Sequence, residues 1–199
     1  SRIGNFQGDG TARHAGPVGS SSRFDGDVAL LSDLLRCERI AANSPALADG
    51  TDELTYGDYG RLAGQLAGLL IDNGVEPGDR VGVHLRKSVF SFVAVHAVIR
   101  AGAVMVPLDA LAPVDHLVSV IDDANIDVLI SDGRAATLTE LAAAGVRAVV
   151  IRSSRAVEID NVDMLSWDTL DTLVPRDAIP VDPDDPAYII YTSGSTGKP

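Results

Sequence analysis

The chain has 199 residues, of which 46% are hydrophobic, and a formal net charge of −12. This length and apolar content suffice for one large domain or for a domain and a half. The negative charge, with no basic run after residue 40, argues against nucleic acid or an anionic membrane surface as the main partner, and the single cysteine, Cys37, excludes a disulfide within the chain.

The N-terminal residues 1–23 are rich in glycine, serine and arginine and show no apolar period. We expect them to be a disordered leader or a cloning remnant outside the fold, which then comprises residues 24–199. Leucines at helical spacing predict a first helix over residues 33–42. Two short strands, 45–48 and 53–55, are predicted to follow, joined by a tight turn.

Helices and strands then alternate along the chain. The predicted helices cover residues 56–73, 88–101, 113–124 and 135–144, and the predicted strands cover residues 79–85, 103–106, 127–131 and 147–151. Apolar strands that alternate with helices are typical of α/β proteins, so we expect a mainly parallel sheet flanked by helices on both faces. Residues 152–186 show less regular patterning, and their proline- and aspartate-rich end is expected to deliver a last strand, 187–191, to the sheet edge.

The last residues, 191–199, read Tyr-Thr-Ser-Gly-Ser-Thr-Gly-Lys-Pro. Glycines let backbone N–H groups approach an anion, hydroxyls add hydrogen-bond donors, and Lys198 adds positive charge, so the composition predicts a polyphosphate-binding loop. The Walker A loop is excluded, because two residues instead of four separate Gly194 from Gly197 and Pro199 occupies its Ser/Thr position. A surface turn without a ligand is the structural alternative.

The same residues resemble the phosphate-binding signature Y-T-S-G-[ST]-T-G-x-P-K-G of the adenylate-forming enzymes, which include acyl-CoA synthetases, luciferase-like ligases and nonribosomal peptide synthetase adenylation domains. Two further segments, 54–59 and 98–109, resemble the family's elements L-[ST]-Y-x-[DE]-L and K-x-G-A-x-x-x-P-L-[DN], although Tyr59 departs from the first. The resemblance implies that residues 24–199 are the N-terminal portion of an AMP-binding domain, ending inside the phosphate loop.

By this resemblance the chain belongs to a ligase that joins a carboxylate to the α-phosphate of MgATP and passes the resulting acyl-adenylate to a thiol. The thiol belongs to coenzyme A or to the phosphopantetheine of a carrier protein. The resemblance assigns ATP phosphate binding to Thr192, Ser193, Gly194, Ser195, Thr196, Gly197 and Lys198. It places the acid pocket, the ribose-binding carboxylate and the adenylate-stabilising lysine outside the chain, so no catalytic residue is assigned within it and residues 1–199 alone are expected to be inactive.

Several alternatives remain open at this point. Ser195 and residues 106–109 favour amino-acid adenylation over acyl-CoA ligation of a fatty or aryl acid, whereas residues 110–113 keep only the second proline of the P-x-x-P that usually follows in adenylation domains. From another class, the chain could be a noncatalytic scaffold with a relic adenylation fold. The expected partners are a carboxylic acid, a carrier protein and the remainder of the adenylation domain.

The remaining polar residues indicate no protein-bound metal. The four histidines lack metal-ligand spacing, and His84 and His96, on buried elements, are interpreted as satisfied core histidines. The acidic pair Asp122-Asp123 is interpreted as solvated. The longest apolar stretch, 92–108, is too short and too interrupted for a membrane span, and with no apolar segment typical of a signal peptide the protein is predicted to be cytoplasmic.

Overall fold

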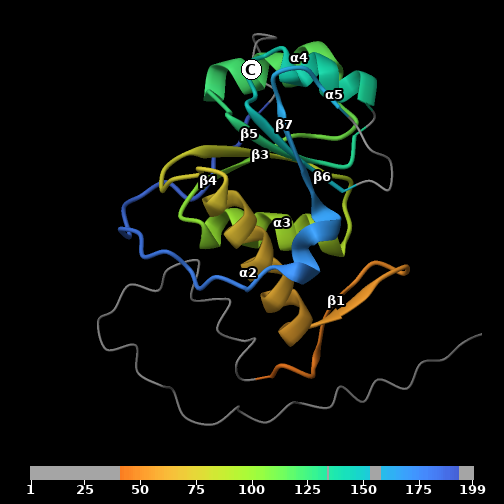
Figure 1. Cartoon of the computed structure of the whole chain (residues 1–199), viewed down its shortest axis with the longest axis vertical. Helices are drawn as coiled ribbons and strands as arrows, with labels where there is room; N and C mark the ends of the chain where they lie inside the picture. The colour runs from red at the N-terminus through yellow and green to blue at the C-terminus, as the bar shows by residue number, and fades with distance from the viewer. Residues whose placement is uncertain (1–40, 134, 153–157, 193–199) are drawn as a thin grey trace, which may run out of the picture.

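The computed structural model describes residues 41–133, 135–152 and 158–192, which build a parallel sheet with helices on both faces (Figure 1). Its strands are β3 (Arg80–His84), β4 (Val104–Pro107), β5 (Val128–Ser131), β6 (Ala148–Ile151) and β7 (Asp163–Ser166). The helices are α2 (Tyr56–Asp72), α3 (Val89–Arg100), α4 (Val114–Ala124), α5 (Ala135–Ala142) and the 3-10 helix η2 (Trp167–Thr172). An antiparallel hairpin of β1 (Pro45–Ala48) and β2 (Glu53–Thr55) precedes them. The predicted α/β class is confirmed, whereas most of the predicted helix 33–42 lies outside the described residues.

The order of the strands explains why helices cover both faces of the sheet. The order is β4-β3-β5-β6-β7, so the chain passes from β3 to β4 and then crosses back over β3 to reach β5. Connections between parallel strands are right-handed, and crossovers in opposite directions therefore place their helices on opposite faces. Accordingly, α3 packs with α2 on one face, and α4 packs with α5 on the other (Figure 1).

Local sequence signals set the ends of the helices. The Thr55 hydroxyl accepts the Asp58 N–H at 3.1 Å and so caps the start of α2. At the start of α3, Ser88 and Ser91 cap each other's backbone N–H groups. After α2 the chain turns at Gly74, whose φ of +80° favours glycine.

The sheet separates two hydrophobic cores. The first lies between the sheet and helices α2 and α3 and includes Leu66 and Leu70, while the second lies against α4 and α5 and includes Leu117 and Leu129. Strands β5 and β6 are buried along their whole length. Burial on both faces explains why these strands are continuous apolar runs instead of alternating patterns.

The region after β6 differs from the sequence prediction in two ways. Residues 152–186, predicted as irregular, contain β7 and η2; β7 pairs with β6, but its four residues include only two apolar ones, too few for a strand pattern. Conversely, the strand predicted over 187–191 is reduced to an isolated parallel bridge between Tyr188 and Met105. Pro186 has no N–H with which to extend the pairing, and Tyr188 and Ile190 are exposed, so burial stabilises one side of this segment only.

Residues 173–181, here called the strap, cross α2 and α3 before the chain returns to β4 (Figure 1). Two buried side chains hold the strap through its carbonyl groups: Gln65 donates to Leu173 at 2.9 Å, and Arg100 donates to Arg176 at 3.1 Å. Because both donors are buried, these hydrogen bonds also satisfy polar groups that would otherwise be costly inside the fold. The strap therefore fixes the course of the chain from η2 toward the last described residues.

Two glycines on α2 give a test of this contact. We expect Gly64→Ala to destabilise the fold, because a Cβ there would lie 2.9 Å from the Pro175 Cβ and 3.1 Å from the Arg176 carbonyl oxygen. A Cβ at Gly68, one turn later, would lie 3.1 Å from the flexible Arg176 side chain and at an ordinary contact distance of 3.6 Å from the Val174 carbonyl oxygen. Alanine gains about 1 kcal/mol of helix propensity at either position, and overpacking costs about 1–3 kcal/mol.

Urea unfolding should therefore find Gly64→Ala up to about 2 kcal/mol less stable than the parent and Gly68→Ala up to about 1 kcal/mol more stable. Because the two sites share one helix and one strap, each variant controls for the other. Equal effects at the two positions would contradict the close packing of the strap on Gly64.

The interpretation of His96 as a satisfied core histidine is wrong. Its Nδ1 is buried and has no hydrogen-bond partner among the described residues, and its ring lies 4.7 Å from the ring of Tyr59, centroid to centroid. The helix interface between α2 and α3 thus offers this ring an aromatic neighbour instead of a polar one. His96 contributes to packing and leaves one nitrogen desolvated.

This environment predicts acid sensitivity of the fold. Burial, and then the charge of Arg100, lower the pKa of His96 to about 4, whereas an unfolded chain has a histidine pKa of about 6.5. Between about pH 6.5 and pH 4, the unfolded state binds a proton that the folded state does not, so the stability contributed at neutral pH is lost as the pH falls. His96→Leu should flatten this part of the stability–pH profile in urea unfolding, and a variant with the parent's slope would contradict the assignment.

Candidate functional site

The carboxyl ends of the parallel strands meet at one edge of the sheet, which is where open α/β folds bind ligands. At this edge β3 leads into residues 85–88, β4 into residues 108–113 and β5 into residues 132–133. The chain changes its direction across the sheet between β3 and β5. The neighbouring loops therefore diverge and leave room above the strand ends.

Residues 187–192, here called the approach segment, pass beside β4. The Met105 N–H donates to the Ala187 carbonyl at 3.0 Å, and the Ile189 N–H donates to the Met105 carbonyl at 3.0 Å. The bridge is parallel, so the segment continues in the same direction as β4, toward the carboxyl edge. The partly buried Ile189 packs against the second core.

The approach segment ends at Thr192, the first residue of the predicted phosphate loop and the last described residue. Thr192 is exposed, next to the partly buried Tyr191. The other predicted phosphate-binding residues, Ser193, Gly194, Ser195, Thr196, Gly197 and Lys198, lie outside the described residues. Their assignment to ATP phosphates stays a prediction.

Tyr191 makes a contact that the sequence analysis missed. Its hydroxyl donates to the Asp123 carboxylate, Oη to Oδ2, at 2.5 Å. Asp123 lies in the last turn of α4 and is exposed, as predicted for the acidic pair, but it is not merely solvated. No sequence signal could have found this pair, because 68 residues separate its members.

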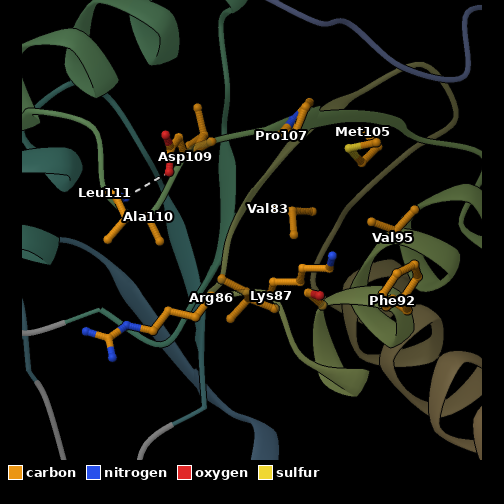
Figure 2. Close-up of a pocket in the computed structure, with 13 residues that line it drawn as sticks. Val83, Arg86, Lys87, Phe92, Val95, Met105, Pro107, Asp109, Ala110 and Leu111 are labelled. Carbon is orange, nitrogen blue, oxygen red and sulfur yellow. Dashed lines mark hydrogen bonds between the residues drawn. The ribbon is translucent and has the colours of Figure 1, made fainter. Parts of the chain in front are cut away.

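A cleft of about 750 Å³ opens at the same edge, between α3 and the ends of β3 and β4 (Figure 2). Its walls are mostly apolar, with Met105 and Phe92 on one side and Leu111 on the other, and Arg86 and Lys87 extend in opposite directions at its base. The volume is in the range of small-molecule sites. The Asp109 carboxylate is turned to its own loop, where it accepts the Leu111 N–H at 2.9 Å.

A buried polar pair lies beneath the neighbouring loops. His84 Nδ1 is 2.9 Å from the Ser131 hydroxyl, which also accepts the Gly133 N–H at 2.9 Å. Burial lowers the pKa of His84, against the opposing charges of Asp132 and Asp109, so the ring is neutral at neutral pH. The interpretation of His84 as a satisfied core histidine is confirmed, and the pair fixes the turn that follows β5.

Neither a metal cluster nor a membrane helix was found in the part of the chain that the structure describes. No group of three or more histidine, cysteine, aspartate or glutamate side chains in residues 41–133, 135–152 and 158–192 could hold a metal ion. The helices among these residues are also too short or too polar to cross a membrane.

Known proteins share both the sequence and the fold. A sequence model described as AMP-binding enzyme matches residues 36–199. Enterobactin synthase component F from Escherichia coli is 36% identical over 160 residues, which cover 79% of this chain and 11% of that protein. The chain therefore spans about a tenth of the length of this relative.

Two solved structures superpose on most of the chain. VinN in complex with L-aspartate has a TM-score of 0.69 at 27% identity, covering 86% of this chain and 42% of the VinN chain. FmoA3, a nonribosomal peptide synthetase, was solved with AMPPNP bound and has a TM-score of 0.64 at 28% identity, covering 82% of this chain and 16% of that one. The chain therefore belongs to the AMP-binding enzyme family, as the motifs at 54–59, 98–109 and 191–199 predicted.

Proposed function

We propose that this chain is the N-terminal part of an adenylation domain that activates a carboxylic acid as an acyl-adenylate with ATP. Residues 24–199 would supply the sheet and the ATP phosphate loop, and the acid pocket would lie in the remainder of the domain. The observation that carries the proposal is the parallel bridge at Met105, which holds the segment directly before Thr192 beside β4. The family membership supports acid activation in general.

The proposed role of the loop follows from the charge changes of the reaction. The carboxylate oxygen bonds to the α-phosphorus, and the bond from the α-phosphorus to the α,β-bridging oxygen breaks, so negative charge accumulates on the departing pyrophosphate. Hydroxyl groups of Ser193, Ser195 and Thr196, with backbone N–H groups near Gly194 and Gly197, would stabilise that charge. Magnesium is expected to arrive with ATP as part of the substrate.

The acceptor of the acyl group is proposed to be a thiol. Similarity to enterobactin synthase component F and to the nonribosomal peptide synthetase FmoA3 supports a carrier-protein phosphopantetheine, with an amino acid or another acid as substrate. Acyl-CoA ligation of a fatty or aryl acid is the second candidate. It keeps the same first half-reaction and differs in the thiol that takes the acyl group.

Acid-dependent ATP–pyrophosphate exchange tests the proposal. The complete protein, incubated with radiolabelled pyrophosphate and a panel of amino, aryl and fatty acids, should form labelled ATP with at least one acid. The 199-residue chain should not exceed a no-enzyme control, because the acid pocket is proposed to lie outside it. If no acid supports exchange by the complete protein although MgATP binds, a noncatalytic scaffold replaces the proposed function.

The thiol acceptor needs a second measurement. Coenzyme A and a phosphopantetheinylated carrier protein should be offered separately to the complete protein with the acid identified by exchange. Formation of an acyl-carrier protein, and not of acyl-CoA, is the expected result. Acyl-CoA as the main product would favour the second candidate.

A further inference from the structure

The approach segment is held by few polar contacts near its end. Its backbone hydrogen bonds to β4 are made at Ala187 and Ile189. After Ile189, the only further hydrogen bond recorded among the described residues is the one from Tyr191 to Asp123. The orientation of the chain entering residue 192 therefore depends on this single side-chain bond and on the packing of the Tyr191 ring against the second core.

The chemistry of the pair suits a fixed anchor. A hydroxyl that donates to a carboxylate forms a charge-assisted hydrogen bond, shorter and stronger than a neutral one. Desolvation of the Tyr191 ring, and then the hydrogen bond to Asp123, raise the pKa of Tyr191 to about 12, so the hydroxyl keeps its proton at neutral pH. The apolar body of the ring packs while its polar end is bonded, which fixes both ends of the side chain.

The position of Asp123 on α4 indicates that its role lies outside the helix. The last turn of α4 contains Asp122 and Asp123 and no basic residue. Acidic side chains at a helix C-terminus are unfavourable, because the helix dipole is negative there. Asp122 is exposed, and its side chain makes no hydrogen bond to another described residue, whereas the Asp123 carboxylate accepts the Tyr191 hydroxyl.

We propose that the hydrogen bond between Tyr191 and Asp123 positions the phosphate loop, with both residues acting as positioning residues for binding of the β,γ-phosphates of ATP. The bond joins α4, which is part of the packed core, to the residue directly before Thr192. This inference rests on the proposed function of residues 192–198. In this proposal neither side chain contacts the nucleotide, so their effect is on where the loop begins and not on the chemistry itself.

Nucleotide binding by the complete protein gives the first test. Tyr191→Phe keeps the ring and removes the hydroxyl, and Asp123→Ala removes the acceptor. Each variant should raise the Kd for MgATP about three- to tenfold, while the Kd for AMP, which lacks the β,γ-phosphates, stays unchanged. The double variant should be no weaker than either single variant, because both remove one interaction. Asp123→Asn, which keeps an acceptor oxygen, should be closer to the parent.

Matched controls lie beside both residues. Tyr188→Phe alters an exposed tyrosine of the same segment, and Asp122→Asn alters the neighbouring acid of the same turn, so neither should change the Kd for MgATP. A loss of AMP and MgATP binding in equal proportion would show a general structural role and overturn the proposal. An unchanged Kd for MgATP in Tyr191→Phe and Asp123→Ala would also overturn it.

Hydrogen exchange of the 199-residue chain separates this inference from the proposed function. Tyr191→Phe and Asp123→Ala should each speed amide exchange in peptides covering residues 188–199 by about three- to tenfold, and the two control variants should not. This readout needs neither an acid substrate nor turnover. If the parent shows no pyrophosphate exchange while Tyr191→Phe and Asp123→Ala still change hydrogen exchange and MgATP binding, the proposed reaction fails but the positioning role of the pair stands. Unchanged hydrogen exchange in both variants overturns the positioning role.

Discussion

Gly194→Val in the complete protein is expected to lower acid-dependent ATP–pyrophosphate exchange by about 100-fold or more. A valine side chain would hold the backbone away from the phosphates, and it disfavours any positive φ that glycine accepts freely. Removal of a single backbone or side-chain donor from a charge-stabilising site typically costs about 10²–10³ in rate. The prediction is made from the sequence pattern, because Gly194 lies outside the described residues.

Lys198→Ala is the matched comparison within the same loop. Lys198 stands at the variable position of the signature, and an ammonium group exposed to solvent is screened by salt. Its loss should lower exchange by less than about fivefold, the usual range for an exposed charge pair. If Lys198→Ala proved more harmful than Gly194→Val under the same conditions, backbone donation would not be the main function of the loop.

Gly82→Val is expected to destabilise the fold by about 3 kcal/mol or more, the upper range for overpacked cores. Gly82 lies in the centre of β3, and a Cβ there would lie 2.9 Å from Leu129 Cδ1, 3.1 Å from Leu108 Cδ1 and 3.2 Å from Ile126 Cγ2. Leu129 is fully buried, so in a close-packed core its side chain can move only by displacing its neighbours. Urea unfolding of the purified variant measures the loss of stability.

A second substitution in the same place distinguishes overpacking from other defects. Leu129→Ala alone removes a buried leucine and should cost about 2–5 kcal/mol. Combined with Gly82→Val, however, Leu129→Ala makes room for the new methyl groups. The double variant should therefore lose less free energy of unfolding than the two single variants lose together. Strictly additive effects would show that the space beside Gly82 is not filled by Leu129.

The sequence predicts the alternating part of this fold well, because each element there has a strong local signal. Thr55 and Ser88 mark helix starts, and the strands from β3 to β6 are apolar runs between helices of clear period. β7 was missed because its pairing with β6 supplies the stability that its own four residues do not encode. Tertiary contacts decide whether such short strands form.

The candidate site, too, could be predicted from the sequence only in part. The proposed phosphate-loop residues 192–198 can be predicted from sequence because the motif is contiguous. The cleft beside Lys87 and the pairing of Tyr191 with Asp123 arise from residues that are distant in the chain and carry no local pattern. The missing partner of His96 could likewise not be foreseen, because it depends on which side chains α2 brings to α3.

The route of the strap has a consequence for how the molecule folds. The contact between Arg100 and Arg176 closes a loop of 76 residues, and the contact between Asp123 and Tyr191 closes one of 68. Contacts between distant residues form slowly, because the chain entropy of closing a long loop is lost before the contact contributes. During synthesis from the N-terminus, β3 to β6 and their helices can therefore assemble before the approach segment docks beside β4. The approach segment, which leads to the proposed phosphate loop, is then added as a late step to a sheet that is already in place.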